Sequence, residues 1–303
     1  MNILEARNIT KTYDGHTALS DLTLDIPQGS VYGLLGPNGA GKTSFIRIIN
    51  QITAPDTGEI LLNGSPMKRD DIYTIGYLPE ERGLYKKMKV GEQAMYLAML
   101  KGLSKSDAKL KLREWFEKFE IQGWWNKKVE ELSKGMAQKI QFIVTIVHDP
   151  KLLIFDEPFS GFDPINTELI KQEIKNLNEN GATVIFSTHR MESVEEICDH
   201  IALINNSKKV LEGSVKQIKE KYRTNTFKIE LHNTKAVVQL NDSCDNLENR
   251  GSSGIVNLKV KLKNGESPNK LIQEVSPFGD IYHLEEVIPT VNDIFIKTVE
   301  TTA

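Results

Sequence analysis

The hydrophobic and polar positions in the first two thirds of the chain follow the pattern of an α/β domain. Short strands joined by turns are expected over residues 3–35, where Asp14-Gly15 is typical of a tight hairpin turn. A helical pattern fills about 165–179 and ends at Asn180-Gly181. Three mostly apolar runs predict buried strands of a parallel sheet, VYGLL (31–35), KLLIFDEP (151–158) and ATVIFSTH (182–189).

Helical periodicity dominates residues from about 88 to 148, and the composition shifts near residues 216–226. Beyond that shift the pattern predicts a small α+β domain of about 80 residues. The polar segment NDSCDNLENRGSSG (241–254) is expected to be a loop. The other expected elements are strands at FKIEL (227–231), AVVQL (236–240), IVNLKVKL (255–262) and DIYHLEEVI (280–288), and helices at NKLIQEV (269–275) and from Thr290. We therefore predict domains at 1–222 and 223–303, with a helical subdomain at about 84–150.

Charge and cysteine content remove several classes of protein from consideration. The net charge of −3 gives no global field that favours nucleic acid or an anionic membrane. Cys198 and Cys244 lie far apart and form no metal-type pair, which favours a reduced, cytoplasmic compartment. The first ten residues carry charge where a signal peptide needs an apolar core, and the longest apolar runs are too short to span a bilayer. Any membrane span is therefore expected to come from another chain.

The segment GPNGAGKTS (36–44) fits the pattern G-x-x-x-x-G-K-[ST] and lies between a predicted strand and a predicted helix. Its glycines let backbone N–H groups approach phosphate oxygens, Lys42 can reach the β- and γ-phosphates, and the Thr43 hydroxyl can bind Mg²⁺. A glycine-rich turn with a chance lysine is the alternative, which this context disfavours. The predicted nucleotide-binding residues of the loop are Gly36, Pro37, Asn38, Gly39, Ala40, Gly41, Lys42, Thr43 and Ser44.

Two acids and a histidine follow the other predicted strands. Asp156 ends the strand LLIFD and can hold the Mg²⁺ shell, and Glu157 can polarise a water molecule for attack on the γ-phosphate. His189 ends the strand TVIFST, at the edge where open α/β sheets bind ligands, and can hydrogen-bond the γ-phosphate. Two solvated acids and a structural histidine are the alternative. The order of the phosphate loop and the acids favours function.

Together these motifs resemble the ATP-binding subunit of an ABC transporter over about residues 1–220. GPNGAGKTS resembles the Walker A loop, LLIFDE the Walker B strand, and SGFD, with Asp163, the D-loop that crosses to a partner subunit. His189 resembles the switch histidine and Tyr13 the aromatic residue that stacks on adenine. The resemblance implies an α/β fold of the P-loop NTPase (ABC ATPase) type with an antiparallel N-terminal part, a helical subdomain, and ATP hydrolysis with Mg²⁺.

The segment LSKGM (132–136) resembles the LSGGQ signature of the same family. Ser133 is a good N-cap and Gly135 bares the backbone, so the segment opens a helix whose N-terminus can bind an anion. The resemblance implies that two subunits pair head to tail, so that Ser133 and Gly135 contact the γ-phosphate of ATP held by the other subunit. An ordinary capped amphipathic helix is the alternative, and both descriptions can hold together.

Two positions depart from the family pattern. Lys134 and Met136 replace the usual Gly and Gln of the signature, and Lys134 either adds positive charge at the phosphate or is a solvated surface lysine. Glu80 stands where the family has the Gln of the Q-loop, which touches Mg²⁺ while its loop contacts the membrane subunit; a carboxylate can also bind Mg²⁺. These variants and the ending VIPTVNDIFIKTVE resemble the sodium- and drug-export branch often called NatA-like.

The resemblance implies an exporter ATPase at the cytoplasmic face of the cell membrane, with a separate transmembrane permease and a second ATPase subunit, identical or not, as partners. The alternative is a soluble, non-transport ABC ATPase that acts on a macromolecule. The lysines of this chain at 101–128 and 208–228 are interleaved with acids, so we expect no nucleic-acid partner. A regulatory binder without hydrolysis is disfavoured by Glu157, and a P-loop kinase does not need a signature helix or His189.

Overall fold

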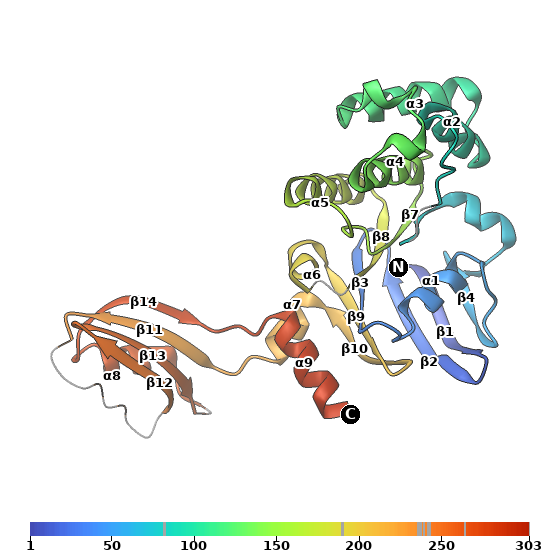
Figure 1. Ribbon diagram of the computed structural model, residues 1–303. Coiled ribbons are helices and arrows are strands. Elements are labelled where there is room, and N and C mark those ends of the chain that lie inside the picture. The colour runs from blue at the N-terminus through green and yellow to red at the C-terminus, as the bar shows by residue number, and fades with distance from the viewer. Residues whose placement is uncertain are drawn as a thin grey trace. The chain divides into compact units, whose positions relative to one another are not determined.

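The computed structural model describes residues 1–80, 83–188, 191–234, 238, 240, 244–263 and 265–302. The chain forms two compact units, residues 1–215 and residues 216–303. The larger unit contains an antiparallel sheet and a six-stranded sheet, and the smaller unit contains a four-stranded sheet of its own (Figure 1). No helix among the described residues is long and apolar enough to cross a membrane.

The N-terminal strands pair as an antiparallel sheet. Its strand order is β2 (His16–Pro27), β1 (Asn2–Tyr13), β4 (Thr57–Leu62) and β5 (Ser65–Pro66). The turn between the first two strands has positive φ at Asp14 (42°) and Gly15 (82°), as a two-residue hairpin turn requires. The hairpin predicted from Asp14-Gly15 is therefore confirmed, with Tyr13 paired to His16 at its tip.

The central sheet contains the three strands that were predicted to be buried because their sequences are mostly apolar. Its order is β10 (Lys208–Ser214), β9 (His200–Asn205), β3 (Val31–Leu35), β8 (Thr183–Thr188), β7 (Leu152–Asp156) and β6 (Ile75–Leu78). All neighbours are parallel except β10 and β9. Every residue of β3, β7 and β8 is buried, which confirms these three predicted strands. Because the three strands are parallel neighbours, their carboxyl ends meet at one edge of the sheet.

Helix α1 (Lys42–Ile49) follows β3 and joins the two sheets. Its apolar residues Phe45, Ile46, Ile48 and Ile49 belong to a core that includes residues of both sheets, such as Leu22 and Ile154. The short 3₁₀-helix η1 (Arg69–Thr74) directly precedes β6, an edge strand of the central sheet. In sequence, α5 (Pro164–Glu179) precedes β8 and α6 (Met191–Ile197) follows it. The helix predicted at about 165–179 is confirmed as α5, whose N-cap is Asp163.

The helical region lies beyond the central sheet in Figure 1. It consists of α2 (Val90–Leu100), α3 (Lys105–Lys118), the 3₁₀-helices η2 (Gln122–Trp124) and η3 (Val129–Glu131), and α4 (Lys134–Ile146). Helix α4 packs against β6 and against α2. Lys118 of α3 pairs with the buried carboxylate of Glu173 on α5, at 2.7 Å, which ties this region to the core.

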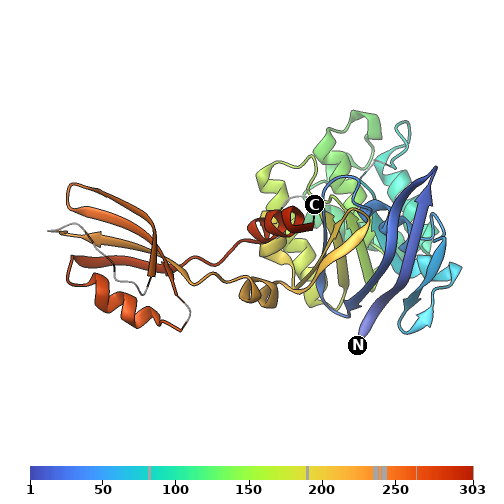
Figure 2. The same cartoon turned by 90° about the horizontal axis from the view of Figure 1, so that it is seen from below.

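The smaller unit is a four-stranded antiparallel sheet in the order β12 (Cys244–Ser252), β13 (Ile255–Leu262), β11 (Thr226–His232) and β14 (Asp280–Glu286). Helix α8 (Pro268–Val275) covers one face, and Leu271 and Val275 pack on the apolar side chains of the strands (Figure 2). The unit also contains most of α7 (Val215–Lys221) and all described residues of α9 (Val291–Thr302).

The prediction of a polar loop over residues 241–254 is wrong for residues 244–252, which form the edge strand β12. All of its residues after Cys244 are exposed, so the strand lacks the alternation of a half-buried strand. Its conformation comes from hydrogen bonding to β13, which composition does not reveal. The predicted strand AVVQL lies mostly outside the described residues, and the other elements predicted in this unit are confirmed.

Candidate functional site

The phosphate-binding loop connects β3 to α1 and is held by close backbone contacts. Gly41 is the N-cap of α1 with φ 113°, and a Cβ atom there would lie 2.3 Å from the carbonyl oxygen of Ala18. Only glycine fits this approach. Lys42 Nζ donates to the carbonyl oxygens of Gly36 (2.8 Å) and Pro37 (3.1 Å), which closes the loop on itself. Within the described part of the chain no side chain caps α1, so its first N–H groups can donate to phosphate oxygens.

Lys42 is buried among three acids. Its side chain is only 7% exposed. Burial lowers the pKa of the Lys42 ammonium, and the negative charges of Glu157, Asp156 and Glu80 oppose that shift. The structure therefore brings the predicted phosphate ligand Lys42 together with all three of the predicted acidic site residues. Lys42 therefore lies in the field of three carboxylates while its Nζ donates to the backbone of the loop.

Asp156 is the last residue of β7 and is 3% exposed. Burial raises the pKa of its carboxyl group, and the charge of Glu157 raises it further, whereas hydrogen bonds from Ser187 and Thr43 and the charge of Lys42 oppose the rise. The Ser187 hydroxyl, on the neighbouring strand β8, donates to Asp156 Oδ1. Asp156 and Thr43, far apart in sequence, thus lie within hydrogen-bonding reach of each other. Their oxygen atoms are of the kind that Mg²⁺ prefers.

Glu157 adopts a backbone conformation that is rare for residues other than glycine. Its φ is 49°, and its N–H donates to the carbonyl oxygen of Ser187 at 3.1 Å. The Thr188 hydroxyl donates to Glu157 Oε2 at 3.2 Å. Glu157 as a whole is 9% exposed. Sequence reasoning missed both Ser187 and Thr188; their position directly before His189 at a strand end is the signal that could have found them.

The other residues predicted for this site differ in how close to it the structure places them. Glu80 follows β6 and is exposed, although its charge acts on Lys42. Tyr13 ends β1 and keeps 38% of its surface exposed, with Lys11 Nζ 5.3 Å from the ring centroid. Tyr13 belongs to the hairpin whose strand β2 touches the loop at Gly41. His189 lies outside the described residues.

The signature segment opens helix α4, as predicted. Ser133 is the N-cap, and its Oγ accepts a hydrogen bond from the N–H of Met136 at 3.2 Å. Ser133 and Lys134 are exposed and Gly135 is partly exposed. The segment lies beside the D-loop, because a Cβ atom on Gly135 would lie 3.6 Å from the carbonyl oxygen of Gly161. The uncapped N-terminus of α1 and the exposed N-terminus of α4 thus lie on different elements of the larger unit.

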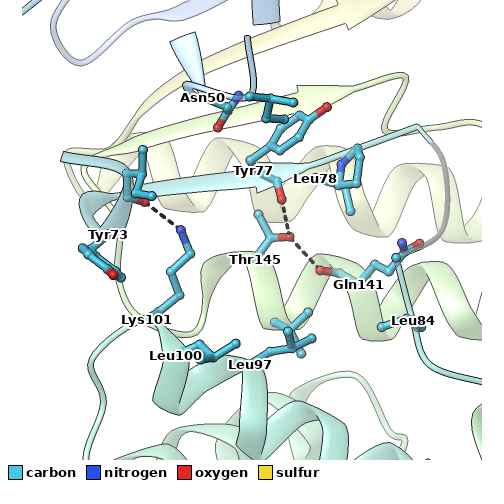
Figure 3. A pocket seen from close by; sticks show the side chains of 15 residues that line it. Asn50, Tyr73, Tyr77, Leu78, Leu84, Leu97, Leu100, Lys101, Gln141 and Thr145 are labelled. Atoms are coloured by element: carbon cyan, nitrogen blue, oxygen red, sulfur yellow. Dashed lines mark hydrogen bonds between the residues drawn. The ribbon is translucent and has the colours of Figure 1, made fainter. Parts of the chain in front are cut away.

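A mostly apolar groove of about 480 Å³ lies between the helical region and the central sheet (Figure 3). Its walls come from the end of α1, from η1 and β6 with the following Pro79, from the end of α2, and from α4. Lys101 Nζ donates to the carbonyl oxygens of Ile72 and Ile75, both at 2.7 Å, and bridges two walls. Thr145 donates to the carbonyl oxygens of Gln141 (2.8 Å) and Tyr77 (3.4 Å). Sequence reasoning missed the groove, since four separate segments build it.

These features define a class of protein. A P-loop ATPase has a glycine-rich phosphate loop, a buried lysine and paired acids at the carboxyl edge of a parallel sheet, as found here. ATPases of the ABC type have in addition a second exposed helix N-terminus, the one at the signature segment. Residues 19–160 match the family model of the ABC transporter, and residues 213–299 match that of the ATP-binding protein DrrA1-3-like, C-terminal domain.

Known proteins resemble the chain over most of its length. It is 40% identical to the uncharacterized ABC transporter ATP-binding protein YhaQ of Bacillus subtilis (strain 168), over 98% of both chains. It is 33% identical to the Nod factor export ATP-binding protein I of Cupriavidus metallidurans, over 70% of this chain and 71% of that protein. A solved ATP-binding subunit of an ABC transporter superimposes with a TM-score of 0.68 at 27% identity, over 73% of this chain and 93% of that structure.

The chain belongs to the ATP-binding proteins of ABC transporters. The predicted family, the ABC ATPase fold and the ATP-hydrolysing activity are thereby confirmed. The protein binds ATP, and the family to which it belongs is that of transporters. One solved ATP-binding cassette with the same fold was described as a dimer with ADP and phosphate bound.

Proposed function

We propose that the chain is the ATP-hydrolysing subunit that powers a membrane exporter and works as a head-to-tail pair. ATP lies between the Walker A loop of one subunit and the signature segment of the other. Residues 1–222 are the ATP-binding domain, with a helical subdomain at about 84–150, and residues 223–303 are an accessory domain. Export is supported by the similarity to a Nod factor export protein and by the resemblance of Glu80, LSKGM and the C-terminal ending to the export branch.

Mg²⁺ and the triphosphate would be held by residues at the ends of three strands, β3, β7 and β6. The backbone of residues 36–44 and Lys42 hold the phosphates, and Thr43, Asp156 and Glu80 hold Mg²⁺. The proximity of Thr43 to Asp156 supports this fit, as does the raised pKa of Asp156, since a buried carboxyl beside Glu157 is stabilised in its ionised form by a cation. When bound, Mg²⁺ supplies positive charge to the β- and γ-phosphates.

Five further residues act on the nucleotide. Glu157 is the general base that orients and deprotonates the attacking water, a role supported by its burial and by the hydrogen bond from Thr188. His189 contacts the γ-phosphate, and Tyr13 stacks on adenine with the ring face that Lys11 leaves open. Ser133 and Gly135 contact the γ-phosphate that the facing subunit holds.

The groove is the docking surface of a separate transmembrane permease. The observation that carries this proposal is the segment from Tyr77 to Glu80. Tyr77, Leu78 and Pro79 line the groove, and Glu80, the next residue, acts electrostatically on Lys42. One short segment therefore touches both the nucleotide site and the groove. A partner seated in the groove is coupled to the state of the nucleotide through this segment.

The permease assignment is tested by purifying the tagged chain from membranes and identifying the chains that accompany it. We expect a transmembrane chain to co-purify and to place the protein at the cytoplasmic face of the cell membrane. Leu100→Glu puts a charge on a groove wall where the side chain is 52% exposed, and should lose that partner without losing ATP affinity. Leu110→Glu, at a position on α3 that is 59% exposed and lies outside the groove, is the matched control.

The same purification identifies the second ATPase subunit as a copy of this chain or as another cassette. Recovery of the chain without any transmembrane partner, bound instead to a soluble macromolecule, would contradict the exporter proposal and leave the ATPase assignment unaffected.

A further inference from the structure

Lys11 covers one face of the Tyr13 ring. The two residues are two positions apart on β1, so their side chains leave the strand on the same face. Lys11 Nζ lies 5.3 Å from the centroid of the Tyr13 ring, within the range of a cation–π interaction. The side chain of Lys11 is 14% exposed, whereas Tyr13 keeps 38% of its surface exposed. An enclosed ammonium group thus lies against an aromatic ring that solvent can reach.

Asp56 holds this lysine from a second segment of the chain. Its Oδ1 lies 2.7 Å from Lys11 Nζ, and its Oδ2 accepts a hydrogen bond from the N–H of Thr12 at 2.7 Å. The N–H of Asp56 donates in turn to the carbonyl oxygen of Thr10 at 2.8 Å. The hydrogen bonds from Lys11 and Thr12 lower the pKa of the Asp56 carboxyl group, which is therefore ionised at neutral pH. One residue thus fixes the three positions that precede Tyr13.

Asp56 also connects the strand that carries Tyr13 to the phosphate side of the site. It directly precedes β4, and the segment in which it lies leads back to α1, the helix that follows the phosphate loop. Thr57, the first residue of β4, pairs with Thr10 of β1. The segment that follows the phosphate loop and its helix therefore returns to β1 and holds it next to Tyr13.

We propose that Lys11 and Asp56 are positioning residues for the adenine ring: Asp56 fixes Lys11, Lys11 covers one face of Tyr13, and the base takes the opposite face. The inference rests on the proposed stacking of Tyr13 on adenine. A side chain that is already held in place loses less conformational freedom when a ligand binds, so the pair raises the affinity for the base. Because other residues hold the phosphates, the pair acts on the nucleotide only through Tyr13.

The test compares two probes, Mg·ADP and Mg·pyrophosphate, by isothermal titration calorimetry. Neither has a γ-phosphate, and only ADP contains the base. Lys11→Met keeps most of the stem and removes the ammonium. We expect ADP affinity to fall about three- to tenfold, the cost of immobilising one free side chain, and pyrophosphate affinity to stay unchanged. Lys11→Arg keeps a cation and should bind ADP as the parent does.

A double-mutant cycle shows whether Lys11 acts through Tyr13. In a Tyr13→Ala background, Lys11→Met should have no further effect on ADP affinity. An equal loss in both backgrounds would overturn the inference, because Lys11 would then act by another route. Parental ADP affinity in Lys11→Met would overturn it as well. Asp56→Asn should weaken ADP binding in the same tyrosine-dependent way, since the amide has no charge with which to hold the ammonium.

Lys171→Met on α5 is the matched control. The side chain of Lys171 is 12% exposed and forms ion pairs with two acids, Glu168 and Glu196. This variant should leave ADP affinity unchanged. A loss equal to that of Lys11→Met would overturn the inference, because removal of an enclosed lysine elsewhere would then have the same effect.

Tyr13→Ala alone separates this inference from the function on which it rests. If Tyr13→Ala lowers ADP affinity while Lys11→Met does not, only the role of the pair is refuted. If Tyr13→Ala binds ADP as the parent does, the proposed stacking on adenine is itself refuted.

Discussion

Glu157 combines burial, a strained backbone and a charged neighbour within one residue. Its φ of 49° is a conformation that costs a residue other than glycine roughly 1 kcal/mol or more. The hydrogen bonds to Ser187 and from Thr188 hold the residue in this conformation. Strain of this kind is kept where it directs a functional group, and here it directs a carboxylate toward the region that contains Lys42.

Glu157→Gln should bind ATP but hydrolyse it slowly. The amide keeps the shape of the side chain but cannot accept a proton, and loss of a positioned base lowers turnover about 10²- to 10⁴-fold, roughly 3–5 kcal/mol of barrier. Steady-state phosphate release and ATP binding at equilibrium measure the two quantities. Glu179→Gln, at an exposed acid on α5, should behave as the parent. Turnover within a factor of two of the parent in Glu157→Gln would refute the role of general base.

Helix α4 links two parts of the molecule. Ser133 caps its N-terminus at the signature segment, and Gln141 and Thr145, two and three turns further along, line the groove. The helix is buried along Ile140, Phe142 and Ile143, and it runs without interruption from the signature segment to the groove.

His148, two residues after the end of α4, gives the larger unit a pH-dependent stability. Burial lowers the pKa of His148 to about 4, and the nearby charge of Lys101 contributes. The unfolded value is about 6.5. Since the folded pKa is the lower one, the contribution to stability is complete above pH 6.5 and is lost as the pH falls toward 4. His148 is partly exposed, so solvent screening reduces the effect, and we expect about 1 kcal/mol less stability at pH 5 than at pH 7.5.

Urea denaturation followed by tryptophan fluorescence measures this difference, because Trp115, Trp124 and Trp125 all lie in the helical region. His148→Gln should flatten the pH dependence by about that amount. His16→Gln, at an exposed position of the N-terminal hairpin, should leave it unchanged. An unaltered pH dependence in His148→Gln would show that the histidine is not the titrating group.

At the scale of the whole molecule, one chain carries a phosphate loop and a signature segment on separate elements. In the loop before α1, Lys42 Nζ donates to a backbone carbonyl oxygen of the same loop. The signature segment at the start of α4 is exposed and lies beside the D-loop. In the proposed head-to-tail pair each nucleotide contacts the loop of one subunit and the signature of the other. ATP then holds the pair together, and hydrolysis weakens it by removing the bridging γ-phosphate.

Mixing two inactive variants tests this arrangement. Ser133→Glu and Lys42→Ala should each abolish turnover alone. In a mixed pair, one composite site carries both changes and the other carries neither, so ATPase activity should return in part. Mixed pairs are identified by purification through two different tags. If they form but hydrolyse no ATP, the signature acts within its own chain or both sites must work together, and the proposed independent composite site is refuted.

The sequence by itself was sufficient for the features that depend on neighbouring residues. Runs such as VYGLL identify buried strands because nearly every position must be apolar, and GPNGAGKTS identifies a phosphate loop because its residue types are needed at fixed spacing. Asp14-Gly15 predicts its hairpin for the same local reason. The order of these motifs along the chain was enough to predict the family and the ATPase activity.

Only the tertiary structure decided which residues of different elements meet. The pairing of β7 with β8 places Ser187 and Thr188 on the two acids. The packing of α4 on the D-loop places the stem of Lys134 over Gly161, and the groove is closed by four separate segments. The edge strand β12 forms because β13 supplies its hydrogen bonds. Such contacts depend on strand order and helix packing, which the whole chain determines through its shared core and which no short segment encodes.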